Sequence, residues 1–208
     1  TIFDVTDTYR FVFGTHWGIH EMRVKKDGSA AVLYCTDDYT TNHADDIFHA
    51  LRFAFLIVAA WHDLFVLHSV SILYQGKAWL FSGSSGTGKS THADLWMNQY
   101  QTPVLNGDLN ILGIKDGMPC VYGLPWCGTS EIYTTTTYPL GGIVFLKQAP
   151  FNRVDFLSLD EQALCLVQED DGYYFSADSF IEEMRSIQFT GSCQSAYHYV
   201  SACTVKWM

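Results

Sequence analysis

The chain is poor in cationic residues. Of its 208 residues, 12 are Lys or Arg and 22 are Asp or Glu, so the formal net charge at pH 7 is −10. Proteins that bind a nucleic-acid backbone usually carry a basic stripe, whereas the few cations here are scattered. The composition therefore argues against nucleic acid as a partner. It still allows a nucleotide, because backbone N–H groups, one lysine and a metal ion can supply a positive field locally.

The chain also lacks cysteine pairs and a membrane-spanning run. None of its six cysteines forms a C-x-x-C pair, which excludes zinc-ribbon and thioredoxin motifs, and we expect reduced thiols. The longest apolar run, residues 47–61, is too short to cross a bilayer and is interrupted by His49 and Arg52. With no signal peptide visible, we expect a cytoplasmic protein without a membrane partner. Because the first residue is Thr1, we expect a processed chain or a fragment.

What is present is a succession of strand and helix patterns. Residues 1–44 predict a small β-rich portion, and Asp45 is expected to cap the helix that follows. The further expected elements are a helix at 47–60, strands at 65–74 and 77–82, a helix at 90–100, a strand pair within 102–123 that turns at Asp116-Gly117, a strand at 139–148, helices at 158–168 and 176–187, and a terminal strand within 195–208. No linker or repeat interrupts this order. The sequence therefore predicts one α/β domain over residues 1–208, with its core in 45–208.

The segment GSSGTGKS, residues 83–90, fits the pattern G-x-x-x-x-G-K-[ST] at every fixed position. An apolar strand precedes it and a helix follows. Glycines let successive backbone N–H groups approach phosphate oxygens, and the helix directs its positive end to the same place. The sequence therefore predicts a nucleotide-binding loop. Its expected phosphate-binding residues are Gly83, Ser84, Ser85, Gly86, Thr87, Gly88, Lys89, Ser90 and Thr91.

Three residues of this region have particular expected roles. Lys89 can reach the β- and γ-phosphates, and the hydroxyl of Ser90 can bind Mg²⁺. Mg²⁺ also needs a carboxylate, which Asp108 supplies between two apolar runs shortly after the loop. Asp108 is predicted to bind the metal or to accept the proton of an incoming hydroxyl. The alternative is an ordinary turn aspartate, as expected for Asp116.

Several of these segments together resemble the kinase domain of HPr kinase/phosphorylase and its relatives, whose nucleotide-binding core is shared with phosphoenolpyruvate carboxykinases. The matching stretches, within about residues 45–165, are LHSVSILYQGKAWLFSGSSGTGKST, PVLNGDLNIL and GLPWCGTSEIYTTTTYPLGGIVFL. The resemblance implies a mixed sheet with a P-loop and flanking helices. It also implies phosphorylation of a serine or other hydroxyl on a protein, peptide or small molecule, with ATP as donor and Mg²⁺ as cofactor.

By position, the resemblance makes His68, Lys89 and Asp108 the catalytic residues, with Ser90 and Asp108 holding Mg²⁺. From the residues alone, His68 is by default a satisfied core histidine of an apolar strand. The family often assembles, so a homo-oligomer is possible. It carries two adjacent acids where this chain has Gly107 and Asp108. The alternative function is therefore a nucleotide-binding module whose transfer activity is weak or lost.

Overall fold

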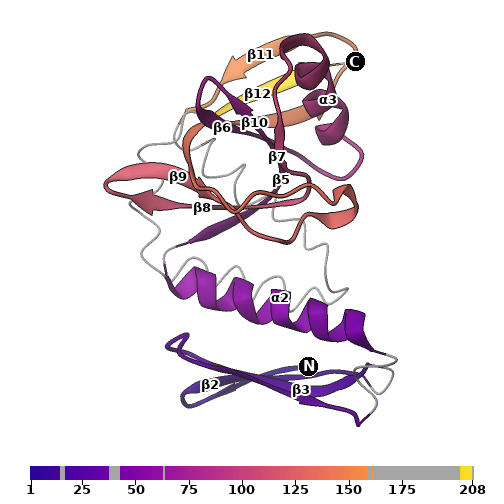
Figure 1. The fold of residues 1–208 in the computed structure, drawn as a ribbon, viewed down its shortest axis with the longest axis vertical. Helices are drawn as coiled ribbons and strands as arrows, with labels where there is room; N and C mark the ends of the chain where they lie inside the picture. The colour runs from indigo at the N-terminus through magenta and orange to yellow at the C-terminus, as the bar shows by residue number, and fades with distance from the viewer. Residues whose placement is uncertain (15–16, 38–42, 63, 159–160, 162–201, 208) are drawn as a thin grey trace. The chain divides into compact units, whose positions relative to one another are not determined.

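Figure 1 shows the computed structural model of the chain, which describes residues 1–14, 17–37, 43–62, 64–158, 161 and 202–207. Contacts group residues 1–62 of these into one compact unit, and residues 64–161 with 202–207 into another. From the sequence, the N-terminal portion is predicted to end at residue 44. The division falls later in the structure because the long helix α2 belongs to the first unit. Whether the two units form one domain, as expected, stays a prediction.

The first unit is an antiparallel sheet with one helix packed on it. Its elements are β1 (Ile2–Val5), β2 (Thr8–Val12), β3 (Ile19–Lys25), β4 (Ala31–Cys35) and α2 (Ala44–Trp61), with the strands in the order β1-β2-β3-β4. Side chains of β3 alternate, so that Met22 and Val24 are fully buried while Arg23 is exposed. Phe11 of β2 meets Phe53 of α2 edge to face, with ring centroids 5.2 Å apart.

The expected cap at Asp45 is wrong. Helix α2 begins at Ala44, so His43 occupies the N-cap position and Asp45 lies in the first turn with Asp46. Oδ2 of Asp46 accepts a hydrogen bond from the Gly18 N–H at 2.9 Å and lies 2.9 Å from Nδ1 of His43. The Gly18 hydrogen bond, with a smaller effect of His43, holds the pKa of Asp46 below its usual value. Asp46 therefore ties the start of α2 to the sheet.

The second unit is built on a mixed sheet, which confirms the coarse α/β expectation. Its elements are β5 (Phe65–Tyr74), β6 (Lys77–Ser82), α3 (Lys89–Tyr100), β7 (Val104–Asn106), β8 (Leu109–Lys115), β9 (Met118–Tyr122), the short 3₁₀ helix η1 (Gly128–Ser130), β10 (Tyr138–Gln148), β11 (Arg153–Phe156) and β12 (Ala202–Trp207). The strand order is β11-β12-β10-β6-β5-β8-β9, with β7 beside β5. Strand β10 runs parallel to β6 and β12, and the other pairs are antiparallel.

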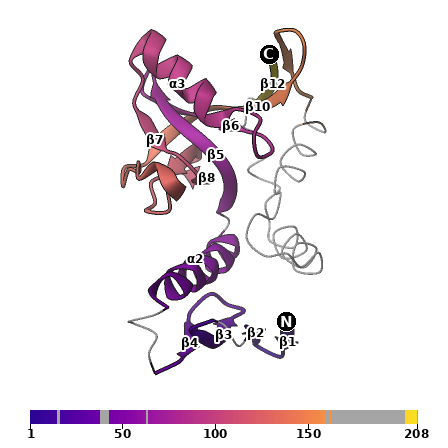
Figure 2. The ribbon, with the colours of Figure 1, turned by 90° about the vertical axis from the view of Figure 1, so that its right-hand side faces the viewer.

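Both faces of this sheet carry buried side chains. Neighbouring residues of β6 and β10 alternate between two clusters, with Leu80 and Phe145 in one and Phe81 and Val144 in the other. Helix α3 packs on β5 and β6 (Figure 2). Its Trp96 packs against the second cluster. The helix that follows the glycine-rich loop is thereby held against the strand that precedes it.

The last expected elements are the two helices and the strand at the C-terminal end of the sequence. Strand β12 falls within the expected terminal strand, whereas β11 was not expected. The helices expected at 158–168 and 176–187 lie outside the described residues, apart from 158 and 161. Within the described part of the chain, no helix is both long and apolar enough to cross a membrane.

Candidate functional site

The strand register brings three polar features to one row of the second unit's sheet, where β6 ends and β8 begins. Ser82, the last residue of β6, pairs with Ser69 of β5. The preceding residue of β5, His68, pairs with Leu109 of β8. The glycine-rich loop, which begins after Ser82, therefore lies on the same row of the sheet as His68 and Asp108. A hydrogen bond of 2.9 Å from the N–H of Ser69 to the carbonyl of Asp108 continues this row.

The glycine-rich loop has a backbone that only glycine adopts readily at two key points. Gly83, the first loop residue, has φ +148°, and a Cβ there would lie 2.8 Å from the carbonyl oxygen of Leu146 and from Oγ1 of Thr87. Gly88, at the N-cap of α3, has φ +97°. The first intrahelical bond runs from His92 N to Gly88 O. The backbone N–H groups of the first turn of α3 therefore point out of the helix end, toward the loop.

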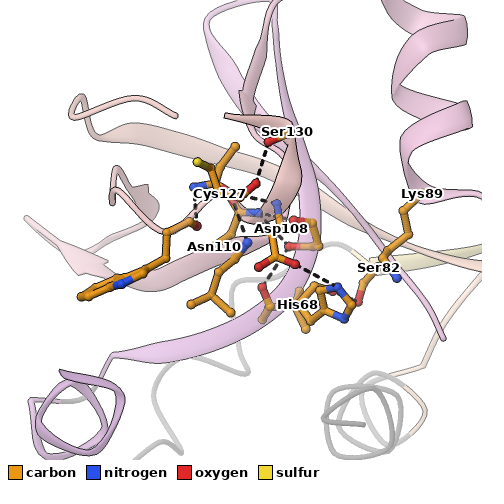
Figure 3. Close-up of polar contacts among 12 residues, drawn as sticks. His68, Ser82, Lys89, Asp108, Asn110, Cys127 and Ser130 are labelled. Atoms are coloured by element: carbon orange, nitrogen blue, oxygen red, sulfur yellow. Dashed lines mark hydrogen bonds and ion pairs between the residues drawn. The ribbon is translucent and has the colours of Figure 1, made fainter. Parts of the chain in front are cut away.

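Lys89 folds back over the loop from the start of α3 (Figure 3). Its Nζ donates to the carbonyl oxygen of Gly83 at 2.6 Å and, more weakly, to that of Ser84 at 3.4 Å. Ser84, Ser85 and Ser90 are exposed. The ammonium group thus lies within the loop, and the serine residues around it are exposed. This arrangement suits an anion that approaches the loop from outside.

His68 and Asp108 form the pair at the centre of Figure 3. Nε2 of His68 lies 3.3 Å from Oδ1 of Asp108, and the two side chains are 25% and 16% exposed. The backbone of His68 is fixed by Ser82, whose hydroxyl donates to the His68 carbonyl at 3.0 Å. Polar contacts therefore connect the strand that leads into the loop with His68 and Asp108. The structure brings together the side chains of His68 and Asp108, and the roles assigned to them stay predictions.

Asn106 is not among the residues predicted for the site, although its side chain holds the turn that carries Asp108. Its Oδ1 accepts hydrogen bonds from the N–H groups of Asp108 at 2.9 Å and Leu109 at 3.1 Å. Its Nδ2 donates to the carbonyls of Leu124 at 3.3 Å and Trp126 at 3.1 Å. Composition offered one signal, since Asn followed by Gly and Asp is typical of a turn in which the Asn side chain bonds the backbone two residues on. No sequence pattern indicates the hydrogen bonds of Asn106 with Leu124 and Trp126.

The segment around η1 packs directly on this turn. A Cβ at Gly107 would lie 2.2 Å from Oγ of Ser130, and a Cβ at Gly128 would lie 2.9 Å from Cβ and Cγ of Asp108. The Ser130 hydroxyl donates to the carbonyl of Cys127 at 2.6 Å, which closes the segment on itself. At each of these two glycines, the backbone of one segment thus packs against a side chain of the other.

An Mg²⁺ site here would rely on few protein ligands. Among the residues that the structure describes, no group of three or more His, Cys, Asp or Glu side chains could hold a metal. The predicted ligands Ser90 and Asp108 offer only oxygen atoms. This set fits Mg²⁺, which is usually held by one or two carboxylates together with substrate phosphates and water. It does not fit metals that require several histidine or cysteine ligands.

Comparison with known proteins finds distant structural likenesses. No family model and no curated protein matches the chain. Among solved structures, the Hpr(Ser) kinase/phosphatase from Coxiella burnetii is similar over 64% of this chain and 93% of that chain, with a TM-score of 0.33 and 8% sequence identity. A likeness at this level assigns neither a family nor an activity.

Proposed function

We propose that the chain is an ATP-dependent phosphotransferase that acts on a serine or other hydroxyl of a protein, peptide or small molecule. The observation that carries the proposal is the strand register, in which the GSSGTGKS loop begins at the same row of the sheet as His68 and Asp108. A loop of this sequence before a helix favours phosphate binding. A carboxylate beside it supplies what a bound nucleotide alone does not, namely a proton acceptor or a metal ligand.

Each side chain has a defined task in such a reaction. Asp108 accepts the proton as the acceptor oxygen bonds to the γ-phosphorus, and the bond from that phosphorus to the bridging oxygen breaks to release ADP. His68, through its contact with Oδ1, orients the carboxylate. Lys89 and the N–H groups of the loop stabilise negative charge on the phosphoryl oxygens. A bound Mg²⁺, held by Ser90 and Asp108, would neutralise further charge on the phosphates.

One observation favours the second candidate, a nucleotide-binding module with weak or lost transfer. Asp108 is preceded by Gly107 rather than by a second acid, and the Ser130 side chain fills the space into which a side chain at Gly107 would project. A single carboxylate must then serve both as metal ligand and as base, or one of these two functions is missing. A site with only one of these functions can still hold a nucleotide tightly.

Variants at two aspartates test the proposal. Asp108→Asn should lower phosphoryl transfer from Mg-ATP by about 100-fold or more, the contribution of a general base, while ATP affinity stays within a few-fold. Asp116→Asn is the matched control, because Asp116 lies in the β8–β9 turn with φ +53°, a conformation that Asn also adopts. Transfer is measured with γ-labelled ATP against extracts of proteins, peptides and metabolites, and affinity by calorimetry.

A third variant tests the loop itself. Lys89→Ala should weaken ATP binding by about tenfold or more, since a charge-assisted hydrogen bond is lost. Lys77→Ala is its control, because Lys77 is exposed at the start of β6. Binding without transfer to any acceptor would support the second candidate. Wild-type protein with no affinity for ATP, ADP, GTP or pyrophosphate would contradict both.

A further inference from the structure

The Asn106 side chain is fully used. Its amide oxygen accepts two hydrogen bonds and its amide nitrogen donates two, which is the capacity of the group. The side chain is also buried, with the residue 2% exposed. A buried side chain whose donors and acceptors are all hydrogen-bonded has one preferred orientation. Rotating the side chain would leave several of these groups without a partner at once. Asn106 is therefore a rigid connection.

The amide oxygen of Asn106 bonds residues close in sequence, whereas the amide nitrogen bonds residues far along the chain. The acceptor side binds the turn that follows Asn106 directly, through the N–H groups of Asp108 and Leu109. The donor side reaches Leu124 and Trp126, which lie 18 and 20 residues further along the chain. An ordinary Asn turn has only the first side. The second side joins the Asp108 turn to the segment that leads into η1.

Packing makes the position of Asp108 depend on that segment. The backbone of Gly128 lies against Cβ and Cγ of Asp108, so closely that a Cβ at Gly128 would come within 2.9 Å of both atoms. On the opposite side, Oδ1 of Asp108 meets Nε2 of His68. The carboxylate is thus held between η1 and β5. A shift of the segment that carries η1 would release one wall of this space.

From these contacts we infer that Asn106 is the positioning residue of Asp108, and that it holds the carboxylate against His68 by fastening the Leu124–Trp126 backbone to the Asp108 turn. The catalytic consequence rests on the proposed function, whereas the effect on the His68–Asp108 contact does not. Asn106 itself is too buried to touch a substrate. It acts through Asp108.

Two variants remove different parts of the connection. Asn106→Ala removes all four hydrogen bonds. Asn106→Asp keeps the acceptors but loses both donors, and it sets a carboxylate oxygen against the carbonyls of Leu124 and Trp126. The matched control is Asn110→Ala. Asn110 is equally buried, and its Nδ2 donates to the carbonyl and hydroxyl of Ser69, which joins β8 to β5 without a bond to the η1 segment.

The first readout is independent of activity. The ring nitrogens of His68 are observed in the ¹H–¹⁵N correlation spectrum of the full chain at fixed pH, assigned by the signal that disappears in His68→Gln. Asp108→Asn defines the signal of His68 without its carboxylate partner. We expect both Asn106 variants to move the His68 signal toward that position, and Asn110→Ala to leave it in place. Asn106→Asp, similar in shape to Asn, serves if Asn106→Ala does not fold.

The second readout separates positioning from general stability. If the wild type transfers phosphate, the Asn106 variants should lose about 100-fold in kcat, the effect of misplacing a reacting group by about 1 Å. Their KM for ATP should stay within about threefold, because the loop is untouched. Asn110→Ala should keep kcat even where it unfolds more easily.

The possible failures are distinct. A His68 signal that stays at its wild-type position in both Asn106 variants overturns the inference, as does an equal shift in Asn110→Ala. An unchanged kcat in a variant whose His68 signal has moved overturns the catalytic consequence. Wild-type protein that binds ATP but transfers no phosphate contradicts the proposed function, while the spectra still decide whether Asn106 positions Asp108.

Discussion

Ser69, Ser71 and Ser82 are fully buried in the second unit, and each hydroxyl donates to a main-chain carbonyl. A small hydroxyl that bonds a nearby carbonyl is satisfied without leaving its strand. Serine therefore brings polar atoms next to the candidate site without an unpaired group. The polar atoms of Asn106 also bond main-chain groups, and its longer side chain joins two different segments.

The acid stability of the protein should depend on His92. Its ring lies 4.9 Å from that of Phe81, and burial lowers the pKa of His92 below its ordinary value. The unfolded chain thus binds this proton more readily, so stability is full above about pH 6.5 and falls as the pH drops below it. We expect His92→Gln to reduce the fall in melting temperature between about pH 7.5 and about pH 5. Circular dichroism measures it.

His62→Gln is the control for this experiment, because His62 is exposed. It should show the wild-type slope of melting temperature against pH. An identical slope in His92→Gln would mean that burial of this imidazole does not govern the acid stability.

At the scale of elements, the contact between η1 and the β7–β8 turn can be tested by filling it. Gly107 lacks a positive φ, so space rather than backbone strain keeps it a glycine. Gly107→Ala would bring a methyl group 2.2 Å from Oγ and 2.5 Å from Cβ of Ser130. We expect a loss of about 1–3 kcal/mol in the free energy of unfolding, as for other overpacked sites, measured by urea denaturation.

Removing the obstructing side chain should reverse this loss. The double variant Gly107→Ala with Ser130→Gly should recover most of the stability, and Ser130→Gly alone reports the cost of losing that side chain. A double variant as unstable as Gly107→Ala would show that the collision lies elsewhere.

Elements with strong local signals were predictable from the sequence. Continuous apolar runs between turn residues gave β5, β6 and β10 nearly to the residue, and the glycine-rich loop announced the start of α3. Strand β11 was missed although Arg153–Phe156 alternate between charged and apolar side chains, because four residues are the shortest run that such a pattern can mark. It exists because β12 pairs with it. Pairing between segments far apart in sequence is not encoded in either segment alone.

The candidate site divides in the same way. The loop residues and Lys89 follow from a local motif. The 3.3 Å contact between His68 and Asp108 requires the register of β5 against β8, which the residues alone did not give. The donor bonds of Asn106 require two carbonyls 18 and 20 residues away. Site residues that belong to one local motif could be predicted from the sequence. Contacts that form only when distant segments pack together could not.

At the scale of the whole molecule, the first unit should affect stability without affecting the candidate site. Asp46→Asn keeps the shape of the side chain but removes the charge that meets the Gly18 N–H and His43. We expect a loss of about 1 kcal/mol at neutral pH, part of the value of a charged hydrogen bond. ATP affinity should be unchanged, since every residue of the candidate site lies in the second unit. Urea denaturation and calorimetry measure the two quantities.

Acid should remove this stabilisation. Because the pKa of Asp46 is lowered in the folded chain, its contribution is present above about pH 4 and is lost as the pH falls through the lowered value. Asp45→Asn, in the same helical turn and exposed, should cost less. A large drop in ATP affinity for Asp46→Asn would show that the two units are coupled.

The position of β12 has a consequence for how the protein is made. This strand, Ala202–Trp207, lies between β10 and β11, both of which precede it by many residues. On the ribosome, β10 and β11 are therefore complete while the strand between them has not yet been synthesised. Their unpaired backbone edges offer a template for other chains in that interval, and pairing between strands so far apart in sequence is slow. The yield of folded protein should then depend on translation speed and chaperone supply as much as on final stability.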